Sequence, residues 1–157
     1  MIRAVTLFLS LCCYAILANA DNGLVIIKSD HSVTETLDRF ESAIRKKGMT
    51  VFARVDHRKG AAGVGLELRP TEVLIFGNPK TGTLLMQGNQ SAGIDLPLKV
   101  LAWQDEHGSV WLAYNDPAWI VKRHAIHDRD AIVTKMQGAL KNFAGLATQA
   151  ATKAAQP

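Results

Sequence analysis

Histidine and aspartate side chains are the groups in this sequence most capable of chemistry. His124 and His127 are three positions apart, so on a helix both imidazoles would lie on one face and could share a metal ion. A third ligand would have to come from His57, Asp116 or Asp128. A histidine beside Asp116 could instead act as a general base, which would make the protein a small enzyme using His124 or His57. The competing interpretation is that the histidines at 124 and 127 are simply exposed beside a helix end.

A second candidate is the glycine-bounded stretch 77–83, which joins an expected strand to an expected short helix starting at Thr83. It resembles a phosphate-binding loop, but such a loop needs lysine directly after its second glycine, and Thr83 stands there. Free backbone N–H groups at the start of the helix, helped by Lys80, could still hold a small anion. The alternative is a purely structural turn. The candidate anion-binding residues are Gly77, Asn78, Lys80 and Thr83.

Further candidates lie at or just beyond expected strand ends, where binding sites collect. They are His57, Phe76, Tyr114, Asn115, Asp116 and His124, and Met86 on the expected short helix is a further candidate. Met86 and His124 could ligate haem, but the sequence has no Cys-x-x-Cys-His attachment motif, and a methionine on an apolar helix face more often packs in a core. Asn115 and Asp116 could equally cap a turn before Pro117. The cofactor therefore stays unknown.

No serine or cysteine has a recognisable nucleophile setting, so hydrolysis by a catalytic triad is not expected. The three tryptophans, Trp103, Trp111 and Trp119, are interpreted as core or dimer packing, or as a wall of an apolar pocket.

The first element that must position these residues is a strand at Leu24–Lys28, followed by an amphipathic helix at Val33–Lys47. Ser32 and Glu35 have the spacing of a capping box, and Gly48 can end the helix in the left-handed conformation. The apolar stripe of the helix, which must cover a sheet, consists of Val33, Leu37, Phe40 and Ile44.

The rest of the chain alternates between short strands and short helices. The first expected strand in this part is Met49–Val55, with Val51, Ala53 and Val55 on one face, and a loop or short helix follows at Arg58–Gly65. The next strand, Val73–Phe76, is expected to be buried on both faces, and it leads to a short helix at Thr83–Gln87. After these we expect a hairpin of Leu98–Trp103 with Ser109–Tyr114, a short helix from Pro117 to Val121, and a last helix capped by Asp128 or Asp130.

The first twenty residues predict a secretory signal peptide, with Arg3 before an apolar run and Ala18-Asn19-Ala20 as the cleavage pattern. The run is too short for a membrane span, so no stable span is expected after cleavage. Cys12 and Cys13 both lie in this leader, which would leave an exported, periplasmic or extracellular protein without thiols. The formal net charge of +4 is mild, and no aromatic residues stack between basic ones, so nucleic-acid binding is not expected.

Four segments carry a resemblance to a known family. They are Gly65–Glu72, Ile75–Thr83, Ile94–Lys99 and Tyr114–Pro117, and they are similar to those of the family called domain of unknown function 302. The resemblance runs from about Gly23 to Leu146. It implies a β-α-β4-α fold grouped with TATA-binding-protein-like folds, a homodimer, and no known activity.

Together these observations predict a single α+β domain over residues 21–148, with a mostly antiparallel sheet, helices on one face and a disordered tail at 149–157. The leading hypothesis is non-enzymatic binding of a small molecule or anion, in a pocket between the Phe76–Thr83 turn and the Asn115–His124 segment. The alternatives are the small enzyme or metal-dependent protein described above, and a structural homodimer that binds an envelope partner.

Overall fold

The computed structural model describes residues 22–150. The predicted signal peptide at 1–20 and residues 151–157 of the predicted tail lie outside the described residues. The elements, in chain order, are β1 (Leu24–Ser29), α1 (Val33–Lys46), β2 (Thr50–Asp56), α2 (His57–Ala62), β3 (Thr71–Gly77), α3 (Pro79–Gly88), the 3₁₀-helix η1 (Gln90–Ile94), β4 (Leu98–Gln104), β5 (Val110–Asn115), α4 (Pro117–Arg123) and α5 (Asp130–Thr148).

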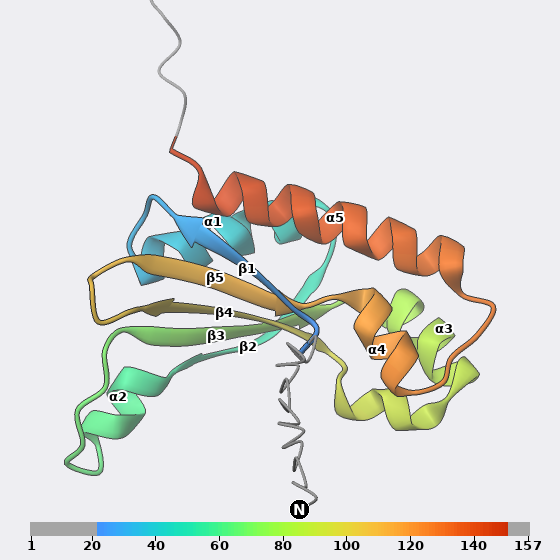
Figure 1. The fold of residues 1–157 in the computed structure, drawn as a ribbon, viewed down its shortest axis with the longest axis horizontal. Helices are drawn as coiled ribbons and strands as arrows, with labels where there is room; N and C mark the ends of the chain where they lie inside the picture. Colours follow the sequence, from blue (N-terminus) through green and yellow to red (C-terminus); the bar gives the residue numbers. More distant parts are fainter. Residues whose placement is uncertain (1–21, 151–157) are drawn as a thin grey trace, which may run out of the picture.

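The five strands form one antiparallel sheet in the order β1-β5-β4-β3-β2. Helices α1 and α5 pack together against one face of it (Figure 1). Helices α3 and α4 lie at the end of the sheet where β3 and β5 finish, and α2 lies at the other end. The predicted α+β class, with an antiparallel sheet and its covering helices on one face, is confirmed.

Helix α1 begins where its cap predicts. The Ser32 side chain accepts a hydrogen bond from the backbone N–H of Glu35, at 3.2 Å, which satisfies one of the free donors of the first turn. The Glu35 carboxylate does not reach back to the cap and lies instead 3.0 Å from Nδ1 of His31. The predicted stripe is fully buried, so α1 covers the sheet as expected.

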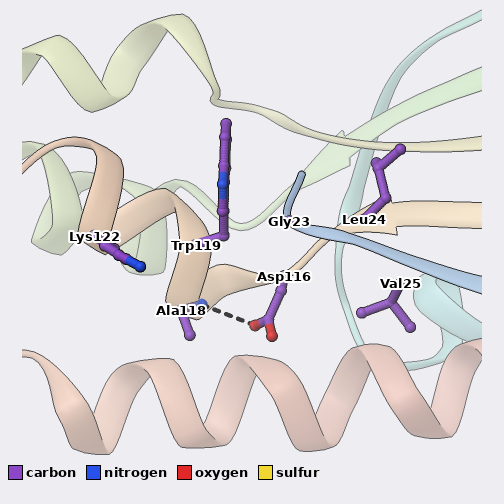
Figure 2. A pocket seen from close by; sticks show the side chains of 7 residues that line it. All are labelled: Gly23, Leu24, Val25, Asp116, Ala118, Trp119 and Lys122. Atoms are coloured by element: carbon purple, nitrogen blue, oxygen red, sulfur yellow. Dashed lines mark hydrogen bonds between the residues drawn. The ribbon is translucent and has the colours of Figure 1, made fainter. Parts of the chain in front are cut away.

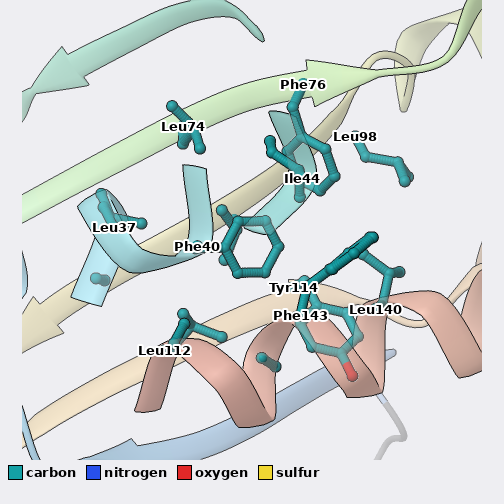
Figure 3. Close-up of a cluster of buried hydrophobic side chains, with 14 of the residues drawn as sticks. Leu37, Phe40, Ile44, Leu74, Phe76, Leu98, Leu112, Tyr114, Leu140 and Phe143 are labelled. Atoms are coloured by element: carbon teal, nitrogen blue, oxygen red, sulfur yellow. The ribbon is translucent and has the colours of Figure 1, made fainter. Parts of the chain in front are cut away.

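The core lies between this sheet face and the two long helices (Figure 3). Phe40 of α1 is at its centre, with its ring 5.2 Å from that of Phe76 and 6.1 Å from that of Phe143, both in edge-to-face geometry. Leu37, Ile44 and Leu74 have no exposed surface and pack in the same cluster. Three separate elements, α1, β3 and α5, are therefore joined through one aromatic contact set.

A β-bulge overturns the predicted face of β2. Val51 pairs with Phe76 and packs against the core, whereas Ala53 pairs with Ile75 and is exposed together with Val55. The register shifts between Val51 and Ala53, and one extra residue moves the following side chains to the other face of the sheet. The prediction that Val51, Ala53 and Val55 share a face was therefore wrong.

Strand β3 is buried on one face only, contrary to expectation. Leu74 and Phe76 point into the core, and Val73 and Ile75 point to the opposite face and are half-buried. In the described part of the chain no helix lies across this opposite face (Figure 1). We call it the open face; its side chains are those of Leu24, Ile26, Lys28, Ala53, Val55, Thr71, Val73, Ile75, Lys99, Leu101, Trp103, Trp111, Ala113 and Asn115.

The remaining helices differ from expectation at their ends. The segment left open as a loop or short helix forms α2, whose N-cap Asp56 accepts from the N–H of Lys59. Helix α5 follows Arg129 without a side-chain cap, so the prediction that Asp128 or Asp130 caps it was wrong. Beyond α5, the carbonyl of Gln149 accepts from Arg39 at 3.2 Å, which holds the first residue of the predicted tail on α1.

Candidate functional site

Most candidate residues meet at one end of the sheet. The register places the end of β3, at Gly77, beside the start of β4, and the end of β5, at Asn115, beside Leu24 of β1. His57 is not part of this group, because it follows Asp56, which pairs with Glu72 at the opposite end of the sheet. His57 is exposed there, so it cannot join the other candidates in one site.

The turn after β3 does not have the geometry predicted for an anion site. Helix α3 starts at Pro79, not at Thr83, because the Asn78 side chain accepts from the N–H of Lys80 at 3.0 Å and caps the helix there. The carbonyl of Asn78 also accepts from the N–H of Gly82. Thr83 therefore lies inside α3, and the first turn of the helix is four residues earlier than the expected anion site requires. Lys80 is exposed on the first turn.

Two other candidates are core residues. Phe76 has no exposed surface, and Tyr114 is 6% exposed with its ring among the core side chains (Figure 3). Burial, together with the negative charge of Asp116, raises the pKa of the Tyr114 phenol. Met86 is half-buried and packs against the same core, and Asn115 lies at the margin of the open face. None of these four lines the cleft that the structure forms at this end.

That cleft has a volume of about 170 Å³ and lies between the start of β1 and helix α4 (Figure 2). We call it the β1/α4 cleft; it is lined by Gly23, Leu24, Val25, Asp116, Ala118, Trp119 and Lys122. It includes part of the predicted Asn115–His124 wall and none of the predicted Phe76–Thr83 wall.

Asp116 is placed at this cleft by its role as the N-cap of α4. Its Oδ1 accepts from the N–H of Ala118 at 2.9 Å and from the side-chain amide of Gln137 at 2.8 Å. The turn chemistry weighed from the sequence is therefore present, and it leaves the carboxylate beside the cleft (Figure 2). Lys122 supplies the opposite charge six residues later, in the last turn of α4.

Trp119 forms the apolar wall, and its position depends on Gly23. The ring packs so closely on the backbone that a Cβ at position 23 would lie 2.2 Å from Cγ of Trp119. The Arg123 guanidinium lies over the same ring, 5.3 Å from its centroid. The indole is held between a glycine backbone and a cation, which fixes one side of the cleft.

His124 is buried, which corrects the expectation of an exposed imidazole. It is 8% exposed and ends α4, and both ring nitrogens have partners: Nδ1 lies 2.7 Å from Oγ of Ser91, and Nε2 lies 2.6 Å from Oδ2 of Asp95. Its predicted partner Asp116 sits at the opposite end of α4. We call Ser91, His124 and Asp95 the Ser91 relay. Sequence reasoning missed Ser91 and Asp95, since no local pattern links residues 29 and 33 positions from the histidine.

The metal site considered for His124 and His127 is not assembled in residues 22–150. Both nitrogens of His124 are hydrogen-bonded as described, and His127 is exposed in the turn after α4. Within this range no three histidine, cysteine or acidic side chains lie together in a way that could hold a metal ion.

The comparison with known proteins identifies the family. Residues 25–143 match the family model described as the domain of unknown function DUF302. The chain belongs to the DUF302 family. An uncharacterized conserved DUF302 protein from Bacillus stearothermophilus, whose crystal structure is known, shares the fold with a TM-score of 0.70 at 19% identity, over 80% of this chain and 98% of that one. Membership establishes the fold and assigns no activity.

This DUF302 protein is also similar to longer bacterial proteins. It is 53% identical over 106 residues to the fluoride-specific ion channel FluC 1 of Brucella suis biovar 1 (strain 1330) and to that of Brucella abortus biovar 1 (strain 9-941). The match covers 68% of this chain and 42% and 39% of theirs, so the chain spans about two fifths of the length of these relatives. Among residues 22–150, no helix combines the length and apolarity that crossing a bilayer requires.

Proposed function

We propose that this DUF302 protein is an assembly domain, which pairs with a second copy through the open face of its sheet. The observation that carries the proposal is an apolar row that crosses all five strands. Successive register partners Ile26, Ala113, Leu101, Val73 and Val55 form it. An antiparallel sheet with one solvated face normally alternates apolar and polar residues, whereas along this row the open-face residues are apolar as well.

The exposed ends of this row favour a protein partner, whereas Leu101 and Val73 are half-buried and Ala113 is buried in the middle of the row. Ile26 is 49% exposed and Val55 is 41% exposed, at the two edges of the sheet, and Trp103 and Trp111 extend the surface along the central strands. Contiguous apolar surface of this kind marks interaction sites in soluble proteins. A twofold axis through the centre of the row would bury the same residues on both copies, which is the isologous arrangement of most homodimers.

The Brucella relatives support a membrane channel as the setting in which the domain works. Their printed name is fluoride-specific ion channel, and this chain matches about two fifths of their length. We infer that the exported protein acts beside such a channel, with the paired domains as its docking unit. Co-purification with the fluoride channel of the same organism, and fluoride tolerance of a deletion strain, test this setting separately from pairing.

The pairing itself is tested by charge placed on the row. Leu101→Glu would bury two carboxylates near the twofold axis and should raise the dimer dissociation constant by about 100-fold or more, since like charges in an interface cost several kcal/mol. Leu146→Glu is the matched control, because Leu146 is 56% exposed on α5, away from the open face. Equal molar masses for the two variants would contradict the proposal.

A second candidate function is supported by the β1/α4 cleft. Its indole wall, the Asp116 carboxylate and the Lys122 ammonium offer one apolar and two charged contacts. The volume of about 170 Å³ is below that of drug-sized pockets, so the ligand would be a small polar molecule with an apolar part. Calorimetric titration with small amino acids and carboxylates tests this, with Lys122→Ala as the variant and Lys141→Ala on α5 as its control. Absence of heat with every probe would contradict it.

A further inference from the structure

The Ser91 relay has the components of a base-activated nucleophile. Ser91 is exposed on η1, whereas His124 is 8% exposed and the Asp95 side chain is 10% exposed. The serine is thus the exposed member of the relay, while the histidine and the carboxylate behind it are shielded. This is the order of exposure that a serine nucleophile with its base and orienting acid requires.

The partners of His124 favour one tautomer of its neutral imidazole. The Asp95 carboxylate can only accept, so Nε2 carries the proton and donates to Oδ2 across 2.6 Å. In the neutral imidazole, Nδ1 then has its lone pair free to accept the Ser91 hydroxyl proton across 2.7 Å. In the familiar serine triad the hydroxyl faces Nε2 and the acid faces Nδ1. Here Nδ1 faces the hydroxyl and Nε2 faces the acid, and the histidine can still act as the base and the aspartate as the orienting acid.

Each member of the relay is held by a further partner. The Asn89 side chain accepts from the N–H of Ser91 at 3.0 Å and donates to the carbonyl of His124 at 2.8 Å, so one amide links the serine to the histidine backbone. Arg123 donates to Oδ1 of Asp95 at 3.1 Å. A nucleophile, its base and its acid are therefore positioned before any substrate arrives.

We propose that Ser91 is a nucleophile for acyl transfer from small carboxylic esters. Oγ attacks the ester carbonyl carbon as its proton passes to Nδ1 of His124. The alcohol leaves with that proton, and Ser91 keeps the acyl group as an ester. Water attacks next, gives its proton to Nδ1, and releases the carboxylic acid while Oγ recovers a proton from His124.

The surroundings limit the substrate and the rate. Ile94, 72% exposed on the same 3₁₀-helix, offers an apolar contact for a short acyl chain on an otherwise open surface. The Ser91 N–H is engaged by Asn89, so it cannot stabilise an oxyanion without breaking that bond. Activation therefore rests on the base, and formation of the acyl-enzyme is a more sensitive measurement than turnover.

The test is covalent labelling of the full exported protein with p-nitrophenyl acetate, read by peptide mass spectrometry. Ser91 should acetylate about 100-fold or more faster than Ser42, an exposed serine on α1, since positioned general bases contribute about that much. His124→Gln and Asp95→Asn should lose this advantage at equal circular dichroism. If His124→Gln fails to fold, Asp95→Asn alone decides.

Two outcomes would overturn the proposal. One is acetylation of Ser91 at the rate of Ser42. The other is fast labelling of Ser91 that persists in a folded Asp95→Asn variant, because the carboxylate would then have no part in activation. A relay that serves only to bridge η1 and α4 gives the first outcome, together with a loss of stability in Ser91→Ala.

Discussion

Trp103 of β4 and Trp111 of β5 are direct register partners, and both side chains lie on the open face. The indole N–H of Trp111 donates to Oδ2 of Asp105 in the connecting turn, at 2.7 Å. The adjacent row of five apolar partners runs parallel to this pair across the sheet. The hairpin thus fixes two large apolar rings at the side of the surface that we assign to pairing.

The Asp105–Trp111 hydrogen bond predicts a pH dependence. The bond from the indole lowers the pKa of the Asp105 carboxyl, with smaller help from the N–H groups of Ser109 and His107. A lowered pKa in the folded state stabilises the protein above the unfolded value, about 3.9, and this contribution is lost as the pH falls through the folded pKa. Urea unfolding at pH 6 and pH 3 measures it. The stability difference between wild type and Asp105→Asn should shrink at pH 3, and an unchanged difference would contradict the assignment.

The aromatic core predicts a large effect at Phe40. Phe40→Ala removes a ring with no exposed surface that contacts Phe76 and Phe143, so it should lower the free energy of unfolding by about 3–5 kcal/mol. Phe52→Ala is the control, since Phe52 is 52% exposed at the bulge of β2 and should cost less than about 1 kcal/mol. Equilibrium denaturation of both variants measures these losses. If both variants lost a similar free energy of unfolding, Phe40 would not be at the centre of the core.

The contact of Gly23 with Trp119 predicts a difference between two glycines. Gly23 and Gly48 both have φ of +72°, so alanine at either position should cost about 1–2 kcal/mol of left-handed strain. Only at position 23 would the new Cβ also collide with a neighbour, because nothing lies within 4 Å at position 48. Gly23→Ala should therefore destabilise more and shift the tryptophan fluorescence. If Gly23→Ala shifted the fluorescence equally in a Trp119→Phe background, or if Gly23→Ala and Gly48→Ala lowered the free energy of unfolding equally, the Trp119 ring would not be held against Gly23.

Local patterns in the sequence predict much of the fold. The α1 helix needs only the Ser32 cap and one apolar stripe, and its start at Val33 is confirmed. The β4–β5 hairpin follows in the same way from two alternating runs around Gly108. Both features depend on residues within a few positions of each other, which is the range over which periodicity and turn chemistry act.

What the sequence could not predict depends on contacts between distant residues. The bulge in β2 is visible only once the pairing of Val51 with Phe76 is known, and it decides which side chains join the open face. The Ser91 relay joins η1 to the end of α4, and neither Ser91 nor Asp95 is close in sequence to His124. The start of α3 was misplaced because Asn78, a good cap, outweighs the glycine at position 82.

Sedimentation equilibrium of the wild-type protein tests the central claim, pairing through the open face, most directly. We predict the mass of two chains at micromolar concentration, and the mass of one chain for Leu101→Glu under the same conditions. A wild-type protein that stays at the mass of one chain throughout the accessible concentration range would contradict the account.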